Sequence, residues 1–374
     1  MGNNVSIKDI AKMAGVSIAT VSRVINKNGK VAKETEEKIL QIMKENNYVP
    51  NLLAKGIRTN KVTTVGIVIP DISNEFFSKI AKQIQTLFFA KGYASIICNT
   101  SEDDKIEKQC IEMLQAQQVG GIIHIVSEKA NKENKILIPT VYLDREPQFS
   151  NKRKDMAIIE SDNLSGGYIA TDAMIKKGCK NIICLSPKGA VSTHKKRCQG
   201  YADSMNENGL NQKIITVDNV SLEEGYNKTK EYIKNNKIDG IFATTDIIAI
   251  GAIKAIKEAG FKIPENVKVF GYDASNMSEV IETPLSTIVQ PIEEMTLAAV
   301  EMLEKNMNGE YDIQKLICGT AENYVCGDLE LQYRYRGRDE TMNWHAKKRA
   351  LSRNPQRGEN VLWELAKYLQ GKSL

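Results

Sequence analysis

The first fifty residues contain three segments in which apolar residues recur at helical spacing. Ser6 and Asp9 form a capping-box pattern at the start of the first segment, and Gly15 interrupts its repeat. A second helix is predicted over residues 17–25 and a third over about residues 33–46. Because the first two helices are joined by a very short turn, the pattern predicts a helix-turn-helix.

From residue 61 onward, short apolar runs alternate with amphipathic segments. Strand, helix and strand at this spacing predict parallel sheets with right-handed crossovers. The runs are numerous enough for two sheets, so we expect two lobes. A last alternating segment over residues 328–336 predicts an edge strand. The apolar runs cover residues 62–70, 94–99, 120–126, 139–144, 156–161, 181–186, 213–218, 239–244 and 267–273.

The predicted fold class is a small all-α helix-turn-helix headpiece followed by a two-lobed α/β core, in which parallel sheets are flanked by helices. A length of 374 residues agrees with more than one domain. Hydrophobic residues make up 42% of the chain without any apolar run near the roughly eighteen residues that span a bilayer. The N-terminus shows no secretory signal pattern, so a cytoplasmic location is expected.

The charges are distributed unevenly. Residues 1–60 hold ten Lys/Arg against five Asp/Glu, and residues 334–374 hold ten against four, whereas the segment between them is acidic. Basic ends indicate contact with a polyanion. The seven cysteines include no CxxC pair, which favours reduced thiols, and the three histidines match no ligand spacing. We therefore expect no metal and no cofactor.

The blocks SIKDIAKMAGVSIATVSRVINKNGKVAKETEEKIL, NYVPN, LLAKGIRT, TVGIVIPDISNEFF, GYIATDAMIKKG, RCQGY, DIIAIGAIKAIKEAGFKIPENVKVFGYD and LSTIVQP follow one another in this order. Together they resemble the lactose/galactose repressor family of bacterial transcription regulators, over about residues 5–335. The resemblance implies a helix-turn-helix headpiece, a hinge helix and a core similar to periplasmic sugar-binding proteins, working as a dimer or tetramer. The implied domains are the headpiece at 1–50, the hinge at 51–60, the core at 61–336 (N-lobe about 61–161 plus 291–325, C-lobe about 162–290) and a basic extension at 337–374.

The function that the resemblance implies is sequence-specific, DNA-binding transcription regulation. We expect a repressor of sugar-utilisation genes that binds a palindromic operator as a homodimer, with no membrane partner, under the control of a small sugar. The sequence is compatible both with an effector that releases the operator and with one that favours operator binding. One alternative is a global catabolite regulator controlled by a partner phosphoprotein. A solute-binding protein would lack the headpiece, and an enzyme would need a nucleophile, an acid–base pair or a phosphate-binding loop that the sequence does not show.

A recognition helix contacts base edges in the major groove with its first turn. The resemblance places Ile18 and Ala19 at the base-contacting positions, with Arg23 one turn later on the same face. Arg23 is expected to bind a guanine, while Ile18 and Ala19 contact thymine methyls. The alternative is that Ile18 packs in the core and Arg23 is a solvated charge. Ser17, Thr20, Ser22 and Asn26 are expected to contact phosphates.

The segment around residues 51–59 is too short to form a stable helix alone, so we expect it to order only on DNA. The resemblance places Ile57 where relatives carry a leucine that inserts into the minor groove. The hinge residues expected at the minor groove are Asn51, Ala54, Lys55 and Ile57.

Sugar recognition needs aromatic faces and fixed polar groups, and open α/β sheets bind ligands at the carboxyl ends of their strands. Alternatives are that one of the two phenylalanines is core, that Asp144 and Arg145 form an interlobe ion pair, and that Asp273 is a turn residue. His194 is predicted to be a solvated loop residue. The expected effector-binding residues are Asn74, Phe76, Phe77, Asp144, Arg145, Arg197, Thr245, Asp273 and Gln290.

The extension at 337–374 leaves three interpretations open. Residues 359–372 place leucines on one helical face, which favours an oligomerisation helix. The basic residues before it suit nonspecific DNA binding, and a solvated extension is equally compatible with the sequence.

Overall fold

The computed structural model describes residues 5–26, 28–46, 48, 63–127, 136–147, 155–189, 191–311, 315–319 and 324–325. The chain forms two compact units, residues 1–63 and residues 64–374. The predicted hinge, the edge strand at 328–336 and the extension at 337–374 lie outside the described residues.

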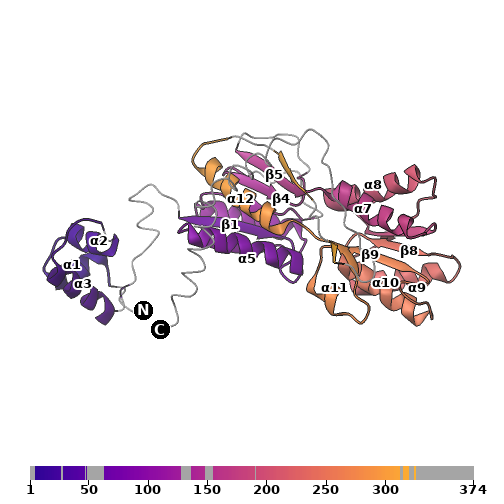
Figure 1. The fold of residues 1–374 in the computed structure, drawn as a ribbon. Helices are drawn as coiled ribbons and strands as arrows, with labels where there is room; N and C mark the ends of the chain where they lie inside the picture. The colour runs from indigo at the N-terminus through magenta and orange to yellow at the C-terminus, as the bar shows by residue number, and fades with distance from the viewer. Residues whose placement is uncertain are drawn as a thin grey trace, which may run out of the picture. The chain divides into compact units, whose positions relative to one another are not determined.

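The first unit contains three helices, α1 (Ile7–Ala14), α2 (Ile18–Asn26) and α3 (Lys33–Glu45) (Figure 1). The predicted capping box is present, because the Ser6 backbone N–H donates to Asp9 Oδ2 at 2.8 Å and the Ser6 hydroxyl accepts the Asp9 N–H. Gly15 ends α1 with a φ of 71°, a conformation that glycine adopts without strain. The helices pack on one another through a small core that includes Ile10, Val21 and Ile39.

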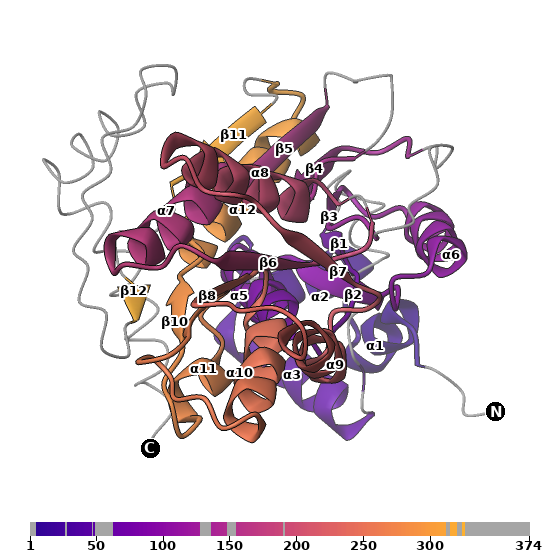
Figure 2. The ribbon, with the colours of Figure 1, turned by 90° about the vertical axis from the view of Figure 1, so that its right-hand side faces the viewer.

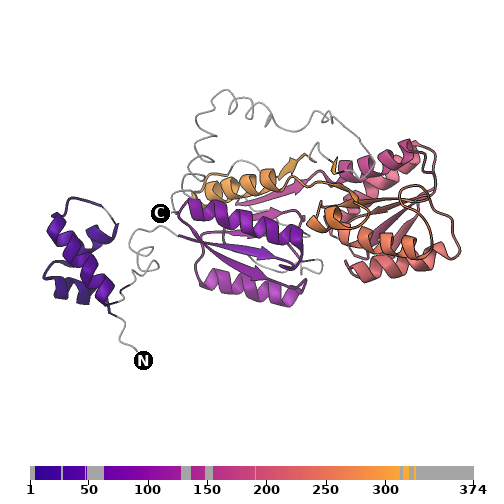
Figure 3. The same ribbon diagram turned by 60° about the horizontal axis from the view of Figure 1, so that its bottom comes forward.

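The N-lobe of the second unit is a six-stranded sheet in which every pairing is parallel, in the order β11-β5-β4-β3-β1-β2. Helices α5 and α12 pack on one face of this sheet and α6 on the other (Figure 3). The elements are β1 (Thr64–Ile69), α5 (Glu75–Ala90), β2 (Ala94–Asn99), α6 (Asp104–Ala116), β3 (Ile122–His124), β4 (Thr140–Leu143), β5 (Met156–Ser161), α12 (Ile292–Met307) and β11 (Lys315–Cys318).

The C-lobe has a second six-stranded sheet, in the order β12-β10-β9-β8-β6-β7. Its pairings are parallel except for β12, which runs antiparallel to β10. Helices α7 and α8 cover one face, and α9 and α10 the other (Figure 2). The elements are α7 (Asn163–Lys176), β6 (Ile182–Pro187), α8 (Ser192–Glu207), β7 (Ile214–Val217), α9 (Leu222–Ile233), β8 (Gly240–Ala243), α10 (Asp246–Glu258), β9 (Lys268–Tyr272), α11 (Asn276–Val280), β10 (Ser286–Ile288) and β12 (Tyr324–Val325).

The two sheets have matching strand orders, so β4 in the N-lobe corresponds to β9 in the C-lobe, and β5 corresponds to β10. The chain passes between the lobes after β5, after β10 and between β11 and β12. Because β12 pairs with β10, the returning N-lobe segment ends after β11 rather than at about residue 325. This duplication has no counterpart in the sequence pattern.

Each of the nine apolar runs predicted from the sequence overlaps a strand of the structure. Within the described part of the chain, the helices are all too short or too polar to cross a lipid bilayer.

Candidate nucleic-acid interface and effector site

The first turn of α2 exposes the side chains that were predicted to contact bases. Ile18 keeps 38% of its accessible surface, and Ala19 and Arg23 are also exposed. Val21 and Val24, on the opposite side of the helix, are buried in the headpiece core. The alternative that Ile18 belongs to this core is therefore wrong.

Two polar residues at the start of α2, Ser17 and Thr20, form hydrogen bonds with each other. The Ser17 hydroxyl accepts the Thr20 N–H at 3.1 Å and shares a hydrogen bond with the Thr20 hydroxyl at 3.0 Å, so Ser17 caps the helix. Ser17 is exposed, and Thr20 and Ser22 are half-buried. Asn26 is the last residue of α2, and its side chain lies outside the described part of the structure.

The turn after α2 packs against Arg23. Gly29 has a φ of 99°, and a Cβ atom at this position would lie 3.4 Å from Arg23 Cδ. A Cβ atom would therefore make only an ordinary contact with Arg23, and it is the left-handed φ that favours glycine here. The hinge residues Asn51, Ala54, Lys55 and Ile57 lie outside the described residues, so their predicted contact with the minor groove stays a prediction.

Asp144 follows β4 in a left-handed conformation with a φ of 66°, and its N–H donates to Ile159 O on β5 at 2.7 Å. Its side chain is buried, and Oδ1 has no hydrogen-bond partner among the described residues. Arg145 Nε lies 4.0 Å from Asp144 Oδ2. Buried polar atoms are normally paired, so an unpaired carboxylate oxygen here is a candidate ligand acceptor.

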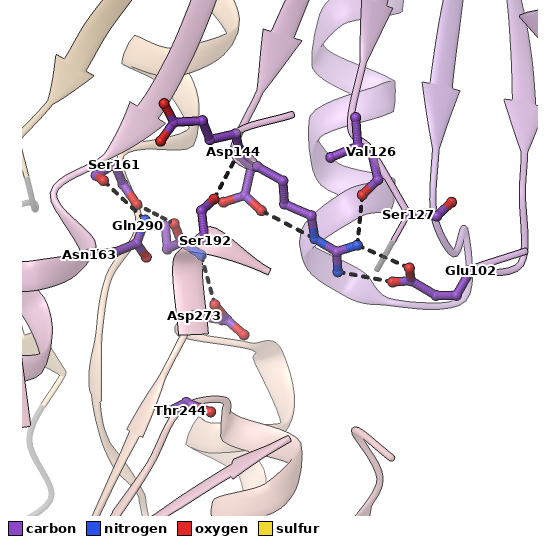
Figure 4. Close-up of polar contacts among 12 residues, drawn as sticks. Glu102, Val126, Ser127, Asp144, Ser161, Asn163, Ser192, Thr244, Asp273 and Gln290 are labelled. Atoms are coloured by element: carbon purple, nitrogen blue, oxygen red, sulfur yellow. Dashed lines mark hydrogen bonds and ion pairs between the residues drawn. The ribbon is translucent and has the colours of Figure 1, made fainter. Parts of the chain in front are cut away.

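Arg145 is fixed mainly by its own lobe. It makes a two-pronged ion pair with Glu102, at 3.0 and 2.9 Å, and Nη1 also donates to Val126 O at 2.9 Å (Figure 4). Its guanidinium lies over the Phe77 ring, 5.1 Å from the centroid. Nε is left without a hydrogen-bond partner in the described structure. Asp144, Arg145 and Glu102 all belong to the N-lobe, so the alternative that Asp144 and Arg145 form an interlobe ion pair is wrong.

Arg197, on α8, is the C-lobe arginine that lies beside Asp273. Nε donates to Asn163 Oδ1 at 2.8 Å, and Nη1 donates to Thr244 O at 2.7 Å. Its guanidinium stacks on the Tyr272 ring, 3.6 Å from the centroid. Nη1 also lies 3.5 Å from Oδ1 of Asp273, the residue that follows β9 with a φ of 110°. The two arginines are thus held in fixed orientations beside the two aspartates.

The two aspartates occupy equivalent positions in the duplicated lobes. Asp273 N–H donates to Ile288 O on β10 at 2.9 Å, which repeats the bond between Asp144 and β5. Gln290 links the lobes, because its Nε2 donates to Asp273 Oδ1 at 2.7 Å and its Oε1 accepts the Ser161 hydroxyl at 2.8 Å (Figure 4). We define Asp144, Arg145, Asn163, Arg197, Asp273 and Gln290 as the interlobe site.

Burial raises the pKa of Asp144 to about 6, although Arg197 and Arg145 oppose the rise. Burial likewise raises the pKa of Asp273 to about 7. The charge of Arg197 opposes this rise, and the charge of Asp246 adds to it. Burial disfavours a carboxylate unless a ligand or a cation compensates it. Strongly shifted groups that face one another between two lobes mark a candidate binding site.

Other predicted effector residues have structural roles that limit their contact with a ligand. The Asn74 amide oxygen caps α5 by accepting the Phe76 N–H at 2.9 Å. Phe76 and Phe77 are both buried in the N-lobe core, where the sequence analysis assigned at most one of them. Thr245 precedes α10 and is buried, and its hydroxyl has no partner among the described residues. Thr245 therefore keeps a polar atom for a ligand, whereas the two phenylalanine rings have almost no exposed face.

Further contacts join the lobes at the edges of the interlobe site. The Glu146 N–H donates to Ser192 Oγ at 2.9 Å (Figure 4), and Lys196 pairs with the buried Glu160 at 2.7 Å. On α5, the Glu75 carboxylate accepts the Asn276 N–H at 3.0 and 2.9 Å. The lobes are therefore linked by hydrogen bonds at each side of the site.

The prediction that His194 is a solvated loop residue is wrong, and several residues of the site were not predicted. His194 is buried in the first turn of α8, because this turn lies where the lobes meet and its Ser192 contacts Glu146 of the N-lobe. Glu102, Asn163 and Tyr272 were not predicted, although they fix the two arginines. Glu102 follows β2 closely, and this position at the carboxyl edge of the sheet could have marked it as a site residue. No group of three or more His, Cys, Asp or Glu within the described ranges could hold a metal ion.

Comparison with known proteins assigns both parts of the chain. Residues 6–51 match the family model for bacterial regulatory proteins of the lacI family, and residues 171–322 match a periplasmic binding protein-like domain. The chain is 34% identical over 305 residues to the ribose operon repressor of Halalkalibacterium halodurans, covering 81% of this chain and 90% of that protein. It is 33% identical over 311 residues to the transcriptional repressor PurR of Histophilus somni, covering 81% and 92%.

Two solved structures are similar over most of the chain. The lac repressor dimer bound to operator and the anti-inducer ONPF covers 87% of this chain and 98% of its own, with a TM-score of 0.76; at 22% identity this is a likeness of fold. The periplasmic binding protein/LacI transcriptional regulator from Alkaliphilus metalliredigens, complexed with D-xylulofuranose, is 31% identical, with a TM-score of 0.63 and coverage of 72% and 99%.

Proposed function

The chain belongs to the lacI family of bacterial regulatory proteins and is a DNA-binding transcription regulator rather than an enzyme, and we propose that its effector is a small sugar. The sugar binds at the interlobe site, between one aspartate and one arginine from each lobe. Binding alters the affinity of the headpiece for operator DNA.

One observation carries the proposal: Asp144 is buried and its Oδ1 lacks a partner in the described structure, while the side chain of Asp273, at the equivalent position of the other lobe, is only 15% exposed. Each carboxylate can accept hydrogen bonds from neighbouring hydroxyls, and Arg145 Nε can donate one. A ligand with several hydroxyls would satisfy these groups on both lobes at once. Its binding would therefore favour the closed arrangement of the lobes.

The same geometry disfavours a purine, the ligand suggested by the likeness to PurR. A planar base is recognised largely by stacking, yet the Phe77 ring is covered by Arg145 and the Tyr272 ring by Arg197. Phe77 is 5% exposed and Tyr272 is fully buried, so neither ring offers a free face. The relatives whose names mention ribose and D-xylulofuranose also support a five-carbon sugar.

On the DNA side, we propose that a homodimer binds a palindromic operator in the cytoplasm. The exposed first turn of α2 supports base contacts by Ile18, Ala19 and Arg23. Ser17, Thr20, Ser22 and Asn26 position the helix through phosphates, and Asn51, Ala54, Lys55 and Ile57 contact the minor groove at the operator centre.

The test is a thermal-shift screen of the full-length protein against pentoses, pentuloses, hexoses, hypoxanthine and guanine, followed by calorimetric titration of the compounds that stabilise it. We expect a sugar to stabilise the protein, and Asp144→Asn and Asp273→Asn to weaken its binding by about 10- to 100-fold, as loss of a charge-assisted hydrogen bond implies. Asp218→Asn is the matched control, because the Asp218 side chain is 62% exposed on the C-lobe surface.

Stabilisation by a purine alone would contradict the proposal. Stabilisation by none of these compounds, with operator binding that responds only to a partner phosphoprotein, would favour the global regulator instead. Linkage gives a second check: the sugar and the operator must change each other's affinity by the same factor.

A further inference from the structure

Two cysteines that the proposed effector contacts do not use face each other in the C-lobe. Cys184 lies on β6, and Cys198 lies on α8, which packs on that strand. Their Sγ atoms are 3.8 Å apart. Cys184 is fully buried, whereas Cys198 is half-buried. A disulfide bond has an S–S length of about 2.05 Å, so the two sulfurs need to approach by roughly 2 Å.

The Cys198 side chain lines an open cavity of about 500 Å³ at the surface of the C-lobe. Two exposed lysines, Lys188 and Lys195, border the same cavity and make it cationic. A small oxidant can therefore reach the Cys198 sulfur from solvent, while Cys184 lies behind it. The lining includes Ser186, Lys188, His194, Lys195, Cys198 and Thr216.

The environment also prepares Cys198 to react. A hydrogen bond with Cys184 lowers the pKa of Cys198 to about 7, with help from Ser186 and the charge of Arg197, although burial acts in the opposite direction. Burial raises the pKa of Cys184 well above its usual range, so this thiol stays protonated. Thiolates are the nucleophilic form of cysteine, so only one member of the pair is activated.

We propose that Cys198 is a site of oxidation by hydrogen peroxide and that Cys184 resolves the oxidised form into a disulfide. In the first step the Cys198 thiolate attacks one peroxide oxygen, the O–O bond breaks, and a sulfenic acid and hydroxide form. In the second step the Cys184 sulfur attacks the sulfenic sulfur, and the displaced hydroxide takes the Cys184 proton and leaves as water. Overall the two thiols lose two electrons, and the peroxide is reduced to two molecules of water. A thiol reductant reverses the change.

The position of the pair gives this oxidation a structural consequence. A disulfide would tie α8 to β6 next to Arg197, the residue that directly precedes Cys198. Arg197 holds Asn163 and stacks on Tyr272. Oxidation would therefore fix the segment that carries the C-lobe arginine.

The N-lobe contains a second pair of thiols that serves as an internal control. Cys98 on β2 contacts Cys110 on α6, and burial raises the pKa of Cys98 to about 12. Cys110 is half-buried, as Cys198 is. The two pairs thus share a strand-and-helix arrangement and similar exposure of the helix cysteine.

The experiment treats full-length protein at pH 7 with hydrogen peroxide at a few molar equivalents, followed by alkylation and peptide mapping. We expect a peptide cross-linked through Cys184 and Cys198 in the wild type and in Cys110→Ser. In Cys184→Ser, dimedone should trap a sulfenic acid at Cys198. Cys184→Ala provides the same test without a buried hydroxyl, if the serine variant does not fold.

Without peroxide, Cys198 should react with iodoacetamide about 5- to 10-fold faster than Cys110, because about half of a thiol with a pKa near 7 is ionised at pH 7. In Cys198→Ser, Cys184 should remain reduced. Cross-linking confined to Cys98 and Cys110, or equal alkylation rates at Cys198 and Cys110, would overturn the proposal.

Discussion

Replacing Asp144 by asparagine should stabilise the protein while it weakens effector binding. Asp144 is almost fully buried beside Arg145, and its pKa is raised to about 6 in the folded state. In the unfolded chain, an aspartate has a pKa of about 3.9. Folding at neutral pH therefore buries a charge that water would solvate better, and asparagine removes this cost.

The pKa shift of Asp144 sets the size of the expected stabilisation and the pH range in which it appears. Below the unfolded pKa the carboxyl is protonated in both states and costs nothing. The cost grows as the pH rises towards the folded pKa, and it is complete above that value. A shift of about two units corresponds to about 3 kcal/mol at pH 8, and roughly half of this cost is already present at pH 5. At pH 8, Asp144→Asn should raise the melting midpoint of the core by about 6 °C.

The measurement compares the thermal unfolding of wild type and variant across this pH range without ligand. The quantity to compare is the difference in melting midpoint between the two proteins, because other groups also titrate in this pH range. The raised pKa values of Asp246 and Asp273 also make stability fall as the pH rises. Burial lowers the pKa of His194, so this residue instead makes stability fall as the pH is lowered. A variant that is less stable than wild type at pH 8, or a difference that does not change with pH, would refute the reasoning. Asp218→Asn should show neither effect.

Three other substitutions test separate parts of the structure. Arg23→Ala should weaken binding to an operator selected from a random library by about 10- to 100-fold per half-site in a mobility-shift assay, because a bidentate guanine contact is worth about 1–3 kcal/mol; unchanged affinity would contradict its assigned role. Gly29→Ala should destabilise α2 by about 1–2 kcal/mol, measured as faster hydrogen exchange of its amides, because the φ of 99° strains any other residue. Glu102→Gln should weaken sugar binding about 10-fold without changing operator affinity, because Arg145 loses its ion pair; calorimetry would show equal affinities if this pairing is unimportant.

Most of the core strands could be predicted because strands buried on both faces are continuous apolar runs. The strands that sequence analysis did not predict are β10, β11 and β12, which have three, four and two residues. β3 also has three residues, but it lies within the longer apolar run at 120–126. The three strands that were missed lie in no such predicted run, so only pairing with neighbouring strands defines them. The correspondence between the lobes was not predicted either, because two sheets can share a strand order without sharing a sequence pattern.

The interlobe site was predictable where a charged residue ends a strand, as at Asp144 and Asp273. The residues that orient the arginines could not be found in this way, since Asn163 and Tyr272 act through Arg197 rather than through a motif of their own. His194 was misassigned because its neighbours are polar. Helical spacing from His194 through Arg197 to Tyr201 marks a buried face, and that spacing outweighs local polarity.

Ser161 and Gln290 each lie two residues beyond the strand residue that accepts the aspartate N–H, so they are equivalent positions in the two lobes, and they are hydrogen-bonded to each other. Equivalent groups in a twofold arrangement can touch only near its axis. Had both positions carried the same residue, the two ends of a bound molecule would meet identical surroundings there. A serine opposite a glutamine breaks that equality, so a ligand without symmetry of its own can be accepted in one orientation and rejected in the other.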